Sequence, residues 1–123
     1  MPKTIAMQEF LAMMGATGFT LPIIQPFDGA VDAQQAMEAI FDVQIIEGHT
    51  GLTLALETAT AGQGPWRAIR EFNTYSLTQA AVYATSREGG GTQFERFLRW
   101  KLDRSSLAAE AWRTCFKICV TLK

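Results

Sequence analysis

The strongest constraint on the fold is an alternation of apolar and polar residues that begins near residue 36. In the segment AMEAIFDVQII, residues 36–46, every second side chain is apolar. The alternating apolar positions are Met37, Ala39, Phe41, Val43 and Ile45. Successive side chains of a strand point to opposite faces of a sheet, so this period of two predicts a half-buried strand.

Five later segments have the same character and predict five further strands. They are LTLALET (52–58), WRAIREF (66–72), AAVYATS (80–86), RFLRWKL (96–102) and WRTCFKICVTL (112–122). The intervening residues have turn or loop composition. We expect GHTG (48–51) to close a tight hairpin, TAGQGP (60–65) to form a loop, and EGGGTQ (88–93) to form a hairpin tip.

Six strands, short connections and no crossover helix predict an antiparallel β-sandwich of jelly-roll-like topology. The alternation also predicts which side chains meet in the core. These are Phe41, Val43, Leu54, Leu56, Leu98, Trp100, Phe116 and Ile118. Most of the basic residues of RFLRWKLDRSS, 96–106, are then expected on the solvent side of a strand whose other side holds Trp100.

The N-terminal segment does not follow the period of two. Met7, Phe10, Leu11 and Met14 recur at the spacing of an amphipathic helix. Two prolines and a glycine then mark TLPIIQPFDGA, 20–30, as extended or turning. We therefore expect residues 1–30 to form a short helix and an extended arm, and residues 31–123 to form the β-sandwich domain. The arm is strongly apolar, and packing against a neighbouring subunit would bury it.

Charge is nearly balanced overall but not along the chain. The formal net charge is −1. Residues 1–66 hold one basic side chain against seven acidic ones, whereas residues 67–123 hold ten against five. In an interleaved sandwich this gives solvated faces of mixed sign, which argues against nucleic-acid binding. Apolar runs are too short to span a membrane, and Gln8 and Glu9 interrupt the only stretch similar to a signal peptide, so we expect synthesis in the cytoplasm without export by that route.

No catalytic or metal-binding pattern emerges from the reactive residues. His49 is the only histidine and lies in an expected turn. Cys115 and Cys119 would be about 13 Å apart on one strand, too far for a disulfide, and are expected to be reduced. Carboxylates that could pair for acid–base chemistry occupy the polar positions of strands, where a solvated charge is the default. They are Glu38, Asp42, Glu57 and Glu71. We therefore predict no catalytic, cofactor-binding or metal-binding residues and no enzymatic activity.

Aromatic residues leave one other class of function open. A carbohydrate-binding or adhesion module stacks sugars on exposed rings. The candidates are Trp66, Trp100, Trp112, Tyr75 and Tyr83. Trp100 and Trp112 hold core positions on strands expected to be adjacent, whereas Trp66 follows a Gly-Pro loop and is expected to be partly exposed.

The C-terminal two-thirds resembles a family of small virion proteins. LTLALETATAGQGPWRAIREF, a glycine-rich turn, RFLRWKL and the closing strand WRTCFKICVTL resemble small virion proteins of tailed bacteriophages and prophages. The resemblance covers residues 36–123, about 70% of the chain. It departs at Ala59, where serine or aspartate is more usual, and it omits the N-terminal arm.

The resemblance implies a capsid decoration (cement) or minor head protein with a β-sandwich fold. The implied partners are the major capsid protein and further copies of the chain, most simply as a homotrimer, and the implied location is the virion. Such a protein binds by surface complementarity and needs no cofactor, nucleic acid or membrane. Charged side chains on edge strands, for which Arg67, Arg70 and Lys117 are candidates, would discourage unwanted strand pairing.

Overall fold

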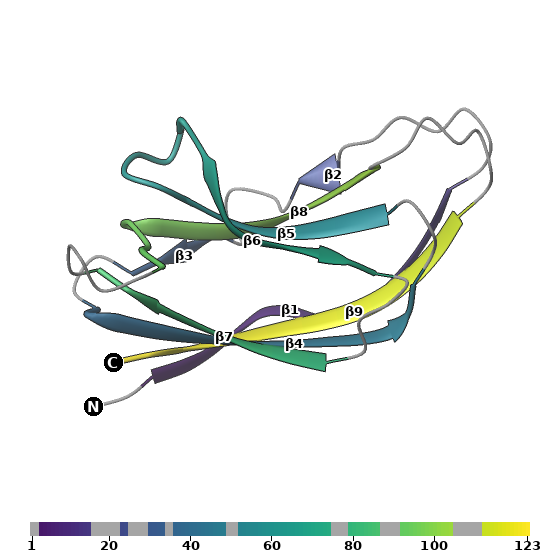
Figure 1. The fold of residues 1–123 in the computed structure, drawn as a ribbon, viewed down its shortest axis with the longest axis horizontal. Coiled ribbons are helices and arrows are strands. Elements are labelled where there is room, and N and C mark those ends of the chain that lie inside the picture. The colour runs from purple at the N-terminus through teal and green to yellow at the C-terminus, as the bar shows by residue number, and fades with distance from the viewer. Residues whose placement is uncertain are drawn as a thin grey trace.

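The computed structural model describes residues 3–15, 23–24, 30–33, 36–48, 52–74, 79–86, 92–104 and 112–123. Over these residues the protein is all β, with two antiparallel sheets stacked face to face (Figure 1). The described residues contain no helix, and hence none with the length and apolar character needed to cross a membrane.

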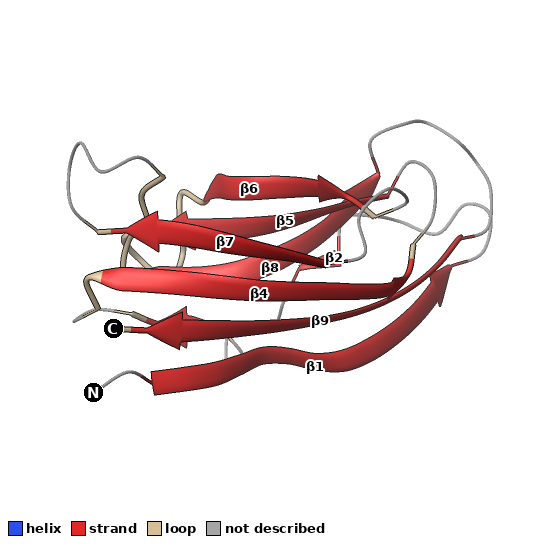
Figure 2. Ribbon diagram, turned by 60° about the horizontal axis from the view of Figure 1, so that its bottom comes forward, coloured by secondary structure: helices blue, strands red, loops and turns tan. Residues whose placement is uncertain are grey.

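The strand order is that of a jelly roll. The first sheet contains, in spatial order, β1 (Lys3–Gly15), β9 (Trp112–Leu122), β4 (Glu38–Glu47) and β7 (Gln79–Thr85), which lie side by side in Figure 2. The second contains β2 (Ile23–Ile24), β8 (Phe97–Arg104), β5 (Leu52–Ala59) and β6 (Arg67–Asn73), and the short β3 (Val31–Asp32) also pairs with β8. With β3 set aside, the strands counted along the chain lie in the orders 1-8-3-6 and 2-7-4-5, so the predicted jelly-roll-like sandwich is confirmed.

The core lies between the inner faces of the two sheets and contains every side chain that the alternation assigned to it. All eight predicted core residues are at most 2% exposed. Trp100 of β8 meets Phe116 of β9 edge to face, with ring centroids 5.1 Å apart. Since β8 and β9 belong to different sheets, this aromatic pair joins the two layers directly.

The predicted N-terminal helix is wrong, because residues 3–15 form β1, the outer strand next to β9. Its pairing runs from Lys3 opposite Leu122 to Gly15 opposite Trp112, with register shifts between Ala6 and Gln8 and between Gln8 and Leu11. Each shift moves later side chains out of strict alternation, which explains why the segment lacks a period of two. The arm is thus hydrogen-bonded to its own sheet over residues 3–15. The division of the chain between residues 30 and 31 stays a prediction.

Two predicted hairpins are also wrong. β4 and β5, which flank residues 48–51, lie in different sheets, and so do β7 and β8. The turn residues 49–51 and 87–91 are outside the described part of the chain. Glycine-rich segments allow a reversal of direction, but either sheet can receive the returning strand because both present an apolar face. The loop at 60–65 does join sheet neighbours, β5 and β6.

Candidate functional site

The outer face of β5 carries a charged side chain that is almost fully buried. Leu52, Leu54 and Leu56 face the core, yet Ala55 and Glu57 on the opposite face are only 4% and 6% exposed. β5 lies between β8 and β6, so side chains from both neighbours cover its outer face. Glu57 is therefore buried by its own sheet.

Two basic side chains bind Glu57, and one of them lies over an indole ring. Arg99 Nε donates to Glu57 Oε1 at 2.8 Å, and Lys101 Nζ lies 3.5 Å from Oε2. The Arg99 guanidinium also lies over the Trp66 ring, 4.0 Å from its centroid. These four residues, Trp66, Arg99, Glu57 and Lys101, are called the Glu57 cluster below. A buried carboxylate with two cationic partners is a compensated charge, which favours a structural role.

Strand register and one glycine place the members of the cluster. Glu57 is directly opposite Arg99, and Lys101 is two residues further along β8, opposite Ala55, so it lies on the same face as Arg99. Trp66 enters from the loop before β6, immediately after a cis Gly64–Pro65 peptide bond. Gly64 has a φ of +89°, and a Cβ there would lie 2.9 Å from Trp66 Cδ1. Only glycine suits this position, because other residues disfavour that φ and the added carbon would press on the indole ring.

Arg96, the basic residue directly before β8, also has an acidic partner. Arg96 donates from Nε and Nη2 to the two carboxylate oxygens of Asp32, at 3.2 and 3.0 Å. The same guanidinium lies over the Phe97 ring at 4.8 Å. The hydrogen bonds to Asp32 raise the pKa of Arg96 above its ordinary value. Arg99 and Lys101 thus lie on the outer side of β8, as the alternation predicted, and both contact Glu57. Arg96 directly precedes β8 and binds Asp32.

The charge imbalance between the two halves of the sequence is neutralised across strands. Among the residues that the structure describes, acids from residues 1–66 pair with bases from residues 67–123 in three places. These pairings are Asp32 with Arg96, Glu57 with Arg99 and Lys101, and Glu47 with Arg113, the last at 2.9 Å. The jelly roll interleaves the two halves, so opposite charges become neighbours.

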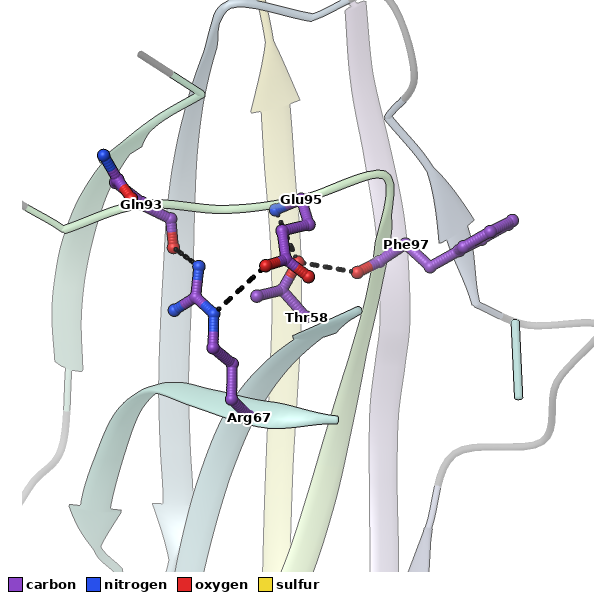
Figure 3. Close-up of polar contacts among 5 residues, drawn as sticks. All are labelled: Thr58, Arg67, Gln93, Glu95 and Phe97. Atoms are coloured by element: carbon purple, nitrogen blue, oxygen red, sulfur yellow. Dashed lines mark hydrogen bonds and ion pairs between the residues drawn. The ribbon is translucent and has the colours of Figure 1, made fainter. Parts of the chain in front are cut away.

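A second polar network, next to the Glu57 cluster, fixes the entry into β8. The buried Thr58 hydroxyl donates to Phe97 O at 2.9 Å and accepts from Glu95 N at 2.7 Å (Figure 3). Arg67 donates from Nη2 to Gln93 O at 3.0 Å, and its Nε lies 3.4 Å from Glu95 Oε1. The segment before β8 is thereby held to β5 and β6 at several points.

The outer face of the first sheet differs, with a shallow hollow of about 170 Å³. Asp42 and Gln44 of β4 and Lys117 and Cys119 of β9 line it. Cys115 and Cys119 are both half-buried free thiols on the single strand β9. Asp42 and Cys119 are opposite each other in register.

The remaining candidate residues do not converge on one site. Glu38 accepts a hydrogen bond of 3.0 Å from the Tyr83 hydroxyl on the first sheet, whereas Glu57 and Glu71 belong to the second. His49, Tyr75 and the Trp112 side chain lie outside the described residues. Where the structure describes side chains, no three His, Cys, Asp or Glu residues are grouped as they would be around a metal ion.

The assignment of charged residues to edge strands is correct for two of the three predicted residues. Arg67 and Arg70 belong to β6, an outer strand, and Arg70 lies over the Phe72 ring at 5.7 Å. Lys117 belongs to β9, which is an inner strand between β1 and β4, so its assignment to an edge is wrong. Sequence reasoning named Glu57 but expected it to be solvated, whereas it is buried, and it did not single out Thr58. Small or apolar residues flank both on β5, and that is the one signal in the sequence that their surroundings are crowded.

Comparison with known proteins shows a shared fold. Neither a family model nor a curated protein matches the sequence. Among solved structures, the whole chain aligns with 87% of a pilus protein from Bacillus endospore appendages, which form disulfide-linked pili, at 12% identity and a TM-score of 0.52. It also aligns over 98% of its length with 32% of VP2 from the infectious bursal disease virus subviral particle, at 15% identity and a TM-score of 0.53. At these identities the likeness is one of fold alone.

Proposed function

We propose that this protein is a non-enzymatic structural subunit of a virion, acting as a capsid decoration (cement) or minor head protein. In this proposal it binds the major capsid protein as a homo-oligomer and stabilises the capsid lattice. The resemblance of residues 36–123 to small virion proteins of tailed phages supplies the type of particle.

The observation that carries the proposal is the alignment of the entire chain, as one jelly roll, with subunits of two extended assemblies. One is a pilus protein and the other a viral capsid protein. Subunits of such assemblies act by presenting a stable surface to neighbours, and weak contacts gain strength when symmetry repeats them.

The pairing of charged groups within the protein supports the same role. The acids and bases of the Glu57 cluster bind each other and do not surround an open reaction site. The expected trimer stays a prediction. The expected packing of the N-terminal arm on a neighbouring subunit gives no support for it over residues 3–15, because they pair with β9 of the same chain.

The carbohydrate-binding alternative depends on Trp66, which is half-buried as expected. However, the guanidinium of Arg99 already lies over this ring at 4.0 Å. A sugar stacking on the same face would have to displace a cation that also binds Glu57, so the alternative is disfavoured.

Electron microscopy of capsids tests the proposal. Empty shells of a candidate major capsid protein, taken from the genome that encodes this protein, would be imaged with and without it. We expect added density at symmetry-related positions and shells that resist a higher temperature. Shells that acquire no density would contradict the proposal. A glycan array probed with the native protein and with Trp66→Ala serves as the competing test, and glycan binding lost only in the variant would favour the carbohydrate-binding alternative.

A further inference from the structure

The outer strands of the two sheets are protected to different degrees. β6 carries Arg67, Arg70 and Glu71 and has a register shift against β5. β1 has two register shifts against β9. In contrast, β7 (QAAVYAT) has no charged residue and pairs with β4 without any shift. Charges and bulges are the usual means of blocking strand addition, so among the longer outer strands that the structure describes, β7 is the one that lacks both.

Backbone hydrogen bonds show which groups of β7 point away from β4. At its C-terminal end, Thr85 N donates to Thr92 O at 2.9 Å, and Phe94 N donates to Thr85 O at 3.0 Å. The next residue, Ser86, donates to Met37 O on the β4 side. Directions alternate along a regular antiparallel strand, so the N–H and C=O of Ala81 and Gln79 point outward, like those of Thr85. The outer edge already accepts a short segment of its own chain at Thr85.

We propose that β7 pairs antiparallel with β7 of a second copy of this chain, about a two-fold axis at Ala81. In this register Ala81 exchanges both of its backbone hydrogen bonds with its symmetry mate, and the amide of Gln79 lies beside the exposed ring of Tyr83 of the other copy. The hydrogen bonds of Thr85 to Thr92 and Phe94 are left intact. The interface is isologous, because the same strand is used on both sides.

Electrostatics favour a second copy as the occupant. No like charges oppose each other at any position of a β7–β7 pair, since the strand has none. The nearest charge in the row is Asp42, which is opposite Ala81 on β4. Its two copies would be three strand spacings apart, about 14 Å, which exceeds the Debye length of about 8 Å at physiological salt. Their repulsion is therefore strongly screened.

The β7–β7 contact adds to the proposed function a specific way in which copies of the subunit meet. Its biological setting, a virion, rests on the proposed function. The contact predicts dimers in solution, or trimers joined in pairs, and it is measured on the protein alone. Capsid binding is measured separately, so either proposal can fail without the other.

Sedimentation equilibrium over a wide concentration range, on the native protein and two lysine variants, provides the test. Ala81→Lys places an ammonium group at the two-fold axis, opposite the same group of the other copy. Within one chain, Asp42 on β4 is opposite this position and offsets the added positive charge. We expect the Kd of self-association to rise about fivefold or more. The matched control is Ala6→Lys. Ala6 is also exposed and lies on β1, the strand at the opposite edge of the first sheet, so this substitution should leave the Kd unchanged.

A second substitution at the same position, Ala81→Pro, covers the case in which Ala81→Lys misfolds. It removes an N–H that faces away from β4, so no bond within the sheet is lost, and the Kd should rise about tenfold or more. A native protein that is monomeric at all concentrations would overturn the inference. Self-association that is insensitive to both Ala81 variants, or equally sensitive to Ala6→Lys, would overturn it too.

Discussion

The second sheet buries side chains on both of its faces, but by different physical means. On the inner face, Leu98, Trp100 and Leu102 of β8 pack against side chains of the opposite sheet and are at most 2% exposed. On the outer face, the buried Glu57 pairs with Arg99 and Lys101 of the same sheet, and Trp66 from the loop before β6 lies against Arg99, so ion pairs replace apolar packing. Burial alone therefore does not identify the core of this protein. The inner face gains stability from buried apolar area and close packing, whereas the outer face gains it from the geometry of its ion pairs.

The inner face should be the more costly to disrupt. Trp100→Ala removes the largest fully buried side chain and its edge contact with Phe116. We expect a loss of about 3–5 kcal/mol in the free energy of unfolding, measured by urea denaturation. Such a loss is a large part of the stability of an ordinary domain. An unchanged melting temperature would mean that the inner face tolerates a cavity and that the contrast between the two faces is wrong.

The outer face should respond to loss of a charge rather than loss of volume. Glu57→Gln keeps the shape of the side chain but leaves Arg99 and Lys101 without their carboxylate. Because these partners are 17% and 28% exposed, water compensates part of the loss, and we expect a cost of about 2–3 kcal/mol. Arg96→Gln is the matched control, since it breaks a solvent-exposed pair with Asp32 and should leave the unfolding curve unchanged. Equal effects of the two variants would show that the Glu57 cluster is an ordinary surface ion pair.

The end of β5 tests whether hydrogen bonds alone hold the entry into β8. Thr58→Val removes the hydroxyl that bridges Phe97 O and Glu95 N while keeping the side-chain shape. We expect a cost of about 1–2 kcal/mol in the free energy of unfolding and faster hydrogen exchange at the Glu95 amide. Thr58→Ser retains the hydroxyl and should preserve the slow exchange. Slow exchange in the valine variant would contradict the bridging role.

The outer face of the first sheet provides the smallest effect. Cys115 and Cys119 are free thiols four residues apart on β9. Alkylation of the denatured protein without reductant, followed by mass spectrometry, should label both sulfurs. A pair protected within one chain would require Cα atoms closer than about 7 Å, which a continuous strand does not allow.

The sequence predicted the strands more reliably than their partners. The alternation placed β4, β5, β8 and β9 and their core side chains correctly, because a half-buried strand leaves its period in the residues themselves. It failed at β1, where register shifts break the period and apolar residues fall by chance at helical spacing. It also failed at residues 48–51, because turn composition encodes a change of direction and not the sheet that the chain enters next.

The Glu57 cluster illustrates the same limit at the level of a site. Alternation assigned Glu57 to the outer side of β5 correctly, and a solvated carboxylate was the natural expectation there. Its burial depends on the register that sets Arg99 opposite it and on Gly64, which directs Trp66 over the guanidinium. Arg99 is far from Glu57 in sequence, and Gly64 and Trp66 are separated from it by most or all of the loop at 60–65.

By itself, the sequence determined that this chain forms strands with one apolar face, which must be hidden between two sheets, and that acids and bases are separated along the chain. Only the tertiary structure decided that β4 and β5 belong to opposite sheets, that residues 3–15 complete the first sheet, and that Asp32, Glu47 and Glu57 meet bases from the other half. The physical reason is that side-chain alternation is a local property of the backbone. Strand partners, in contrast, are selected by the packing of the whole chain, in which several pairings bury similar apolar area and the jelly-roll order also brings opposite charges together.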